Sequence, residues 1–279
     1  MADITRKDVE RQVKRRAPLK EVDMTGLNLD DFNFEGAIFS KCKLTGSTFN
    51  GSDFAFSRFE KCLINDCDMS NCNVQESSFT ECDISKSDLH DSLLIEVNFR
   101  QAVFHSSDFS GAYLKDSVLI EAEGDLCNFS FATLSSSNLS GAKMQVCDFS
   151  ACQAFGIKAA GSDFTGSDFT GARLDSSQLQ DSILNFCNFS QASLQECDLS
   201  QAKLFSATLN SALLNSAILN TALLMSAKAR AAVLNDASLD NANMAKADFS
   251  KSIFNGSSMS GVLDHETVFD GASLEGVTR

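Results

Sequence analysis

Residues 162–171 read Ser-Asp-Phe-Thr-Gly-Ser-Asp-Phe-Thr-Gly, which is the same five-residue unit written twice. The period continues outward in both directions. In steps of five from Met24 to Leu274, 46 of 51 positions are Leu, Phe, Ile, Met or Val. A period of five fits neither an α-helix nor a plain β-strand, so it predicts a coil of short faces joined by turns.

Two further columns accompany this core column. Small residues lie two positions before each large apolar residue, and all ten Cys are among them. Fourteen of the fifteen Gly lie two positions after the core residue, which indicates a recurring turn with positive φ. Phe recurs at 20-residue intervals, as at Phe109, Phe129 and Phe149. We therefore expect four faces of five residues per coil, and about 12 to 13 coils.

This pattern resembles that of the pentapeptide repeat family, in which a small residue, Asp or Asn, and Leu or Phe precede two polar residues. Residues 162–171 and 247–251 match it closely, and the resemblance covers most of the chain. It implies an all-β fold, namely a right-handed quadrilateral parallel β-helix, which is a solenoid with the large and the small column both pointing inward. The expected organisation is a capping helix within residues 1–18 and one repeat domain over residues 19–279.

Residues 3–16 are predicted to form the short helix, with Asp3 as its N-cap and a basic C-terminal end. Such a helix would cover the open edge of the first coil. A basic membrane-binding helix is the alternative, but its apolar stripe is thin. The last coil edge is expected to be exposed, paired with another chain, or cut short. The sequence shows no signal peptide or transmembrane segment, which favours the bacterial cytoplasm.

Five core positions depart from the pattern: Gly124, Ala154, Ala159, Ala229 and Asp264. Gly124 lies beside three acids, and Asp264 puts a carboxylate in a core position. Phe155 could fold inward to fill the space that the two nearby alanines leave. The plain interpretation of each defect is a local bulge with compensating packing, and the functional one is a protrusion that a partner recognises.

The residues favour no catalytic activity, metal site or cofactor. The chain has three His, and no Cys has a candidate His base beside it. Cys spacings of five differ from those of zinc sites. The cysteines are expected to be free, buried thiols in a reducing compartment, although Cys42, Cys62 and Cys82 would stack closely enough for a disulfide. A filled β-helix also lacks the concave, dry site that catalysis needs.

Charge is distributed unevenly along the chain. The net charge is −14, yet residues 199–235 contain no Asp or Glu. Apolar residues stand there at outward positions that elsewhere carry Asp, Asn or Ser. A neutral apolar belt on an acidic solenoid predicts a protein interface; the alternative is packing along the coil with no partner. The candidate interface residues are Leu213, Ile218, Leu223, Met225, Arg230, Val233 and Ile253.

The first functional hypothesis is a non-catalytic scaffold or adaptor that binds another protein. Residues 5–9, 17–19 and 22–27 resemble the lead-in of pentapeptide proteins found with bacterial type VI secretion components, which would imply handling of secreted cargo or the spike. The alternative to a different partner is self-association through the 199–235 belt or the C-terminal coil. Direct nucleic-acid binding is disfavoured by the acidic charge, and no membrane partner is expected.

The second hypothesis is a DNA mimic. The chain resembles quinolone-resistance pentapeptide proteins, which bind DNA gyrase and topoisomerase IV, and an acidic solenoid of about duplex width could occupy their DNA groove. It departs from that group by lacking projecting loops and a C-terminal dimerising helix, and by carrying the acid-free belt. The candidate acidic face comprises Asp53, Asp68, Asp88, Asp108, Asp148, Asp163 and Asp168.

Overall fold

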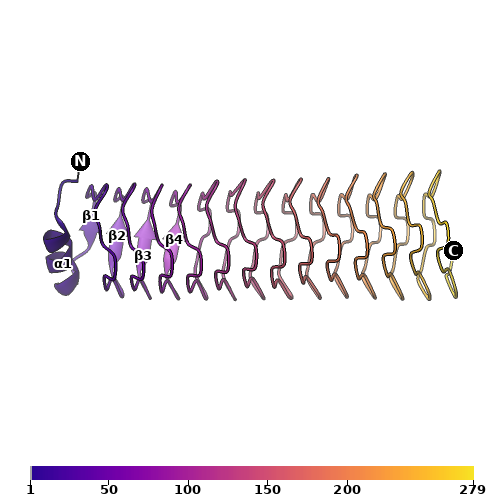
Figure 1. The fold of residues 1–279 in the computed structure, drawn as a ribbon, viewed down its shortest axis with the longest axis horizontal. Coiled ribbons are helices and arrows are strands. Elements are labelled where there is room, and N and C mark those ends of the chain that lie inside the picture. The colour runs from indigo at the N-terminus through magenta and orange to yellow at the C-terminus, as the bar shows by residue number, and fades with distance from the viewer. Residues whose placement is uncertain (1) are drawn as a thin grey trace. The chain divides into compact units, whose positions relative to one another are not determined.

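The computed structural model describes residues 2–279 and divides into two compact units, Met1–Asn138 and Leu139–Arg279, each built of repeating coils (Figure 1). The helix α1 (Arg6–Lys14) precedes the first coil. A parallel sheet on one face of the first unit has the strand order β1-β2-β3-β4. Its strands are β1 (Leu19–Lys20), β2 (Ile38–Ser40), β3 (Arg58–Glu60) and β4 (Ser78–Thr80).

Every pairing within the units joins a residue to the one 20 positions later. Phe39 pairs with Phe59 in the sheet. Single parallel bridges repeat on the other three faces of the coil, and those of the first coil are Asp23↔Lys43, Asn28↔Thr48 and Asn33↔Asp53. The register thus confirms the expected coil of four five-residue faces.

The core column is buried in both units as far as Met259, with rings stacked from coil to coil. The centroids of Phe39 and Phe59 lie 4.3 Å apart with the ring planes inclined by 2°. Phe149 and Phe169 stack at 4.8 Å and 3°. Aromatic rings gain from such parallel contact beyond their buried area, which explains why Phe recurs at the coil period.

The turn column adopts the left-handed conformation throughout, as its glycines predicted. Gly166 has φ +74°, but Val146 and Phe186 also take φ of 56° and 62° in this column. The backbone is held there by the next coil: the N–H of Gly166 donates to the carbonyl of Asn185 at 2.9 Å. The coil therefore imposes this conformation even on side chains that disfavour it.

The small column supplies hydrogen bonds as well as close packing. Ser167 Oγ donates to the carbonyl of Met144 at 2.9 Å and accepts the N–H of Cys147 at 3.0 Å. Cys72 Sγ donates to the carbonyl of Phe49 at 3.0 Å. Ser and Cys in the small column thus add hydrogen bonds to backbone groups at the coil corners while packing as small buried side chains.

The N-terminal helix is shorter than predicted, and its cap is different. The N-cap is Thr5, not Asp3: Thr5 and Asp8 form a capping box, each side chain accepting the other's backbone N–H. The Asp3 N–H donates instead to the carbonyl of Asp23 at 2.8 Å. Arg6 docks the helix by donating to the carbonyls of Asn28 and Asp30, which places α1 against the first coil.

The core defects are repaired locally. At Gly124, the ring of Phe104 fills the missing side chain's place, coming within 2.2 Å of where a Cβ would lie. Phe155 does not move into the core as expected; it stays half-buried, with the Arg173 guanidinium 4.5 Å from its ring centre. Asp264 is half-buried in the last described coil, and its carboxylate is 3.5 Å from the Arg279 guanidinium.

Candidate protein interface

An apolar cluster lies at one corner of the second unit. Phe186 occupies the left-handed turn position, and Phe205 lies one coil later in the adjoining position. Their rings meet edge to face, with centroids 5.5 Å apart and planes at 88°. The side chains are nevertheless 58% and 39% exposed. An edge-to-face aromatic pair held open to solvent is an unusual use of two large apolar side chains.

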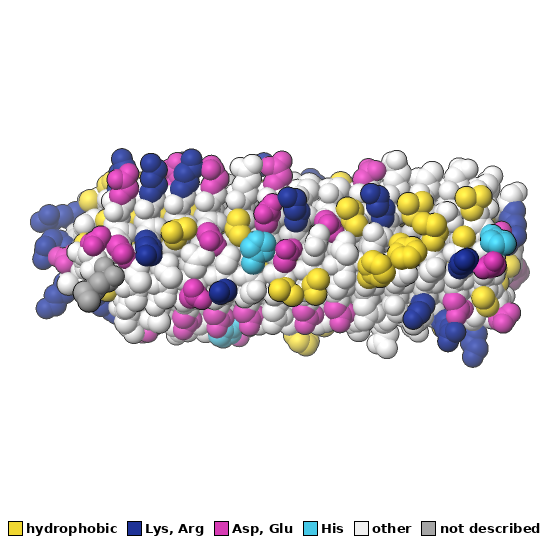
Figure 2. Space-filling view, turned by 90° about the horizontal axis from the view of Figure 1, so that it is seen from above, with side chains coloured by type: hydrophobic (Ala, Val, Ile, Leu, Met, Phe, Trp, Pro, Cys, Tyr) yellow, Lys and Arg dark blue, Asp and Glu magenta, His cyan; other side chains and the backbone are white. Residues whose placement is uncertain are grey.

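Backbone hydrogen bonds hold the cluster in register. The Phe186 N–H donates to the Phe205 carbonyl at 3.0 Å, and the Ser206 N–H donates to the Met225 carbonyl at 3.0 Å. Leu223 stands on the flat face beside this corner. We call Phe186, Phe205, Leu223 and Met225 the apolar corner. Figure 2 shows hydrophobic side chains gathered on this unit.

The structure separates the seven residues predicted as an interface. Leu223 and Met225 join the apolar corner, whereas Leu213, Val233 and Ile253 form a separate stack on another face through the bridges Leu213↔Val233 and Val233↔Ile253. The remaining two stand apart from both groups. Ile218 bridges the polar Asp198 and Ser238 on a third face, and Arg230 pairs with Asp248.

Sequence reasoning missed Phe186 and Phe205. The predicted interface was based mainly on the outward position directly before each core residue. Phe186 and Phe205 lie instead in the two turn positions after it, where Gly and polar residues prevail. Residues 20 positions apart stack in successive coils. Two aromatic residues 19 positions apart in the turn columns are therefore neighbours at the same corner. That offset was the signal available.

The predicted acidic face is only partly continuous. Asp68, Asp88 and Asp108 follow one another through bridges on a single face of the first unit, and Asp148 and Asp168 pair likewise in the second unit. Asp53 and Asp163 belong to other bridge ladders and so to other faces. We call Asp68, Asp88 and Asp108 the acidic ladder.

These carboxylates also have a local structural role. Asp108 Oδ1 accepts the N–H of Ser110 at 2.8 Å, and Asp68 Oδ1 accepts that of Ser70 at 3.0 Å. Asp88 accepts from both the backbone and the ring of His90, whose pKa this contact raises. A side-chain oxygen that accepts the backbone N–H two residues later forms an Asx-turn. Each Asp thus stabilises its own turn and also places negative charge at the surface.

The thiols are poor candidates for chemistry. All ten Cys are free and buried. Burial raises the pKa of Cys72 and Cys67 to about 12. Over residues 2–279, no three His, Cys, Asp or Glu side chains gather as metal ligands would. In the same residues, no helix has the length and hydropathy that a bilayer crossing demands.

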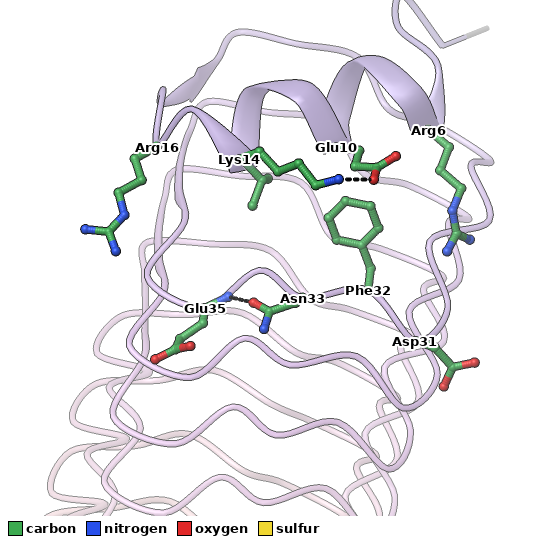
Figure 3. Close-up of a pocket in the computed structure, with 9 residues that line it drawn as sticks. Arg6, Glu10, Lys14, Arg16, Asp31, Phe32, Asn33 and Glu35 are labelled. Carbon is green, nitrogen blue, oxygen red and sulfur yellow. Dashed lines mark hydrogen bonds and ion pairs between the residues drawn. The ribbon is translucent and has the colours of Figure 1, made fainter.

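A hollow of 530 Å³ lies between α1 and the early coils (Figure 3). Phe32 faces it from below, and Lys14 and Glu10 form a 2.6 Å ion pair across its upper side. Arg6 donates hydrogen bonds to the carbonyls of Asn28 and Asp30, and its guanidinium lies 5.7 Å from the centre of the Phe32 ring. The hollow thus lies along the contact between α1 and the first coils, where Arg6, Lys14 and Glu10 already have partners.

Comparison with family models identifies the family of the chain. The model described as "Pentapeptide repeat region" matches residues 32–101, and "Pentapeptide repeats (8 copies)" matches 125–150, 147–185, 182–220 and 222–261. No curated protein matches the sequence.

Among solved structures, HetL of the cyanobacterium Nostoc sp. strain PCC 7120 is 20% identical, with 98% of this chain and 96% of HetL covered and a TM-score of 0.32. Full-length QnrB1, a plasmid-mediated fluoroquinolone resistance protein, is 18% identical, with coverage of 68% and 91% and a TM-score of 0.29. Rfr23 of Cyanothece 51142 is 17% identical, with coverage of 45% and 88% and a TM-score of 0.25. The five-residue columns, the 20-residue register and the family models agree, and this chain belongs to the pentapeptide repeat family.

Proposed function

We propose that this chain is a non-catalytic scaffold that binds another protein through the apolar corner. The observation that carries the proposal is the exposed Phe186–Phe205 pair, to which the acid-free stretch 199–235 contributes Phe205. Large aromatic side chains clustered at a surface are the usual anchors of protein interfaces. The buried thiols and the filled core support the non-catalytic part.

The backbone adds to this argument. Phe186 takes φ 62°, a conformation that costs free energy for a bulky residue. Gly fills the same column at Gly166 with φ +74° and no such cost. The side chain of Phe186 is 58% exposed and lies outside the buried core column, so it is available to a partner together with Phe205.

Affinity capture from the native host tests the proposal. The wild-type chain and a Phe186→Ser/Phe205→Ser variant serve as parallel baits, with bound proteins quantified by mass spectrometry. Phe131→Ser is the matched control, because Phe131 occupies the same turn column with φ 59° and 69% exposure but lies in the first unit. We expect a partner that the double variant loses and the control retains. Equal capture by all three baits would contradict the proposal.

The identity of the captured protein decides between adaptor roles. The N-terminal resemblance favours components of a type VI secretion system or their cargo as partners. Recovery of such components, lost with the double variant, would support a secretion adaptor. Recovery of unrelated proteins with the same loss would support the scaffold and remove the secretion role.

The acidic ladder supports a second candidate function, binding of a type II topoisomerase as a DNA mimic. Three stacked carboxylates at one-coil spacing give a regular line of negative charge, as a DNA backbone does. The test is inhibition of DNA gyrase and topoisomerase IV by wild type and by the triple variant Asp68→Asn/Asp88→Asn/Asp108→Asn. Inhibition that depends on the three charges would favour mimicry, and its absence in wild type would exclude it.

A further inference from the structure

A second feature borders the apolar corner: a pocket of 320 Å³ with three cationic side chains in its lining. Lys228, Arg230 and Lys246 supply the positive charge. The remaining lining residues are Asn210, Ser226, Ala227 and Asp248. In a chain of net charge −14, three converging cations are a local reversal of the surface potential.

The pocket keeps positive charge after its internal pairings. Arg230 Nε lies 2.5 Å from Asp248 Oδ2, so one cation is balanced. Asp248 Oδ1 is already taken by the N–H and hydroxyl of Ser250, and these contacts lower the pKa of Asp248. Lys246 is 3.9 Å from Glu266, with both side chains largely exposed, which is a weak, screened pair. Lys228 adds a further charge, and Asp248, the one carboxylate among the lining residues, is already paired with Arg230.

The pocket and the apolar corner form one continuous surface. Met225 belongs to the corner, and the next residue, Ser226, lines the pocket. Lys246 follows Ser226 in the same turn column one coil later, and the Ser226 N–H donates to the Ala245 carbonyl at 3.0 Å. Figure 2 likewise shows Lys and Arg side chains next to the hydrophobic cluster of this unit.

We propose, on the basis of the scaffold function above, that the partner segment is acidic and apolar. Its aliphatic or aromatic side chains contact Phe186, Phe205 and Met225, and its carboxylates enter the pocket of Lys228, Arg230 and Lys246. Charge complementarity selects this occupant: residues 21–198 and 236–279 carry net negative charge and repel an acidic segment. The corner with its pocket is the surface where such a segment gains both apolar burial and charge pairing.

Binding of synthetic peptides tests this partner chemistry directly. The probe is a fluorescein-labelled peptide of about twelve residues in which Leu and Phe alternate with Glu. One comparison peptide has Lys in place of Glu, and the other has Ser in place of Leu and Phe. In fluorescence anisotropy we expect the acidic apolar peptide to bind at least about tenfold more tightly than either, with binding weakened as salt rises. Equal binding of the lysine peptide, or no binding of the acidic apolar one, would overturn the proposal.

Variants locate the binding to this surface. Lys228→Ser/Lys246→Ser removes pocket charge, and we expect it to weaken the acidic apolar peptide about tenfold. Lys251→Ser is the matched control, since Lys251 and Lys246 are both exposed turn residues with φ of 61° and 63°. Unchanged affinity in the pocket variant, or an equal loss in the control, would show that the pocket does not select the ligand.

The same variants separate this inference from the scaffold function. In the host capture, a partner lost with Phe186→Ser/Phe205→Ser but retained by Lys228→Ser/Lys246→Ser would leave the scaffold intact and overturn the acidic segment. Loss with both double variants and retention by Lys251→Ser would support both. If neither double variant changes capture, the scaffold role of the corner fails as well.

Discussion

Asp108 shows why the repeat favours a carboxylate before each core residue. Its Oδ1 atom accepts the Ser110 N–H at 2.8 Å, which would otherwise be left without a partner at the turn. Asn fills the same role elsewhere: Asn98 Oδ1 accepts the Arg100 N–H at 3.0 Å. The acceptor is the structural requirement, and the charge is additional.

Replacing the charges of the acidic ladder should therefore leave the fold intact. For Asp68→Asn/Asp88→Asn/Asp108→Asn we expect an unfolding midpoint equal to or above that of wild type, because the acceptors remain and repulsion between stacked carboxylates is removed. The corresponding triple Ala variant should unfold at lower denaturant concentration. Chemical denaturation followed by circular dichroism measures both. A large loss of stability in the Asn variant would show that the charge itself stabilises the coil.

Gly124 is required by its neighbour, not by its backbone. A Cβ at this position would lie 2.2 Å from the buried Phe104 ring. We expect Gly124→Ala to lower the free energy of unfolding by about 1 to 3 kcal/mol, the usual cost of overpacking. In a double-mutant cycle with Phe104→Leu, the two effects should be less than additive, since the smaller side chain makes room. Full additivity would mean that the clash is relieved elsewhere.

The buried thiols should make the protein sensitive to alkali. Burial raises the pKa of Cys67 and Cys72 from 9.0 to about 12. Below about pH 9 these two thiols are protonated in both the folded and the unfolded chain. Above about pH 9 they ionise in the unfolded chain but stay protonated in the folded one. The free energy of unfolding should therefore fall between about pH 9 and about pH 12. Urea midpoints across this range measure the effect. Replacing Cys62, Cys67 and Cys72 by Ser, a residue that already occurs in the small column, should flatten the profile.

At the scale of the elements, α1 shows how local pairing overrides a plausible cap. Asp3 was the predicted N-cap, but Thr5 and Asp8 have the three-residue spacing that lets both side chains reach backbone donors. These contacts also hold the pKa of the Asp8 carboxyl below its ordinary value. The pair decides where the helix begins.

Thr5→Ala should loosen α1 without affecting the coils. The Thr5 hydroxyl accepts the Asp8 N–H, and its loss removes half of the capping box. We expect faster hydrogen exchange at the amides of residues 8–14, measured by mass spectrometry. Amides of the second unit serve as the internal control. Unchanged exchange in α1 would show that Arg6 alone fixes the helix.

At the scale of the whole molecule, net charge opposes folding. A charge of −14 produces self-repulsion in the compact state, and many of the carboxylates stand in register one coil apart. Added salt should therefore raise the unfolding midpoint. Thermal unfolding in about 50 mM and about 500 mM sodium chloride measures the change. A midpoint that falls with salt would indicate that ion pairs outweigh the repulsion.

The fold was largely predictable from the sequence because one short period fixes core, turn and register together. Phe39 and Phe59 fall in the same column whatever the details of the turns. The candidate interface was predictable only in part. Leu223 and Met225 were identified from the missing acids, but recognising Phe205 and Phe186 as neighbours requires the geometry of a corner. Leu213 and Ile218 are close in sequence yet lie on different faces.

Because each coil has 20 residues, the number of five-residue units between two surface residues decides whether they lie on the same face. Inserting five residues between Ser206 and Ala207 would keep every core residue in its column, yet move each later side chain to the next face. Lys228 and Lys246 would then lie a quarter-turn away from Phe186 and Phe205. Only an insertion of a whole coil restores the original alignment of later side chains. Gain or loss of single repeats in such a protein can thus leave folding untouched while exchanging one partner for another.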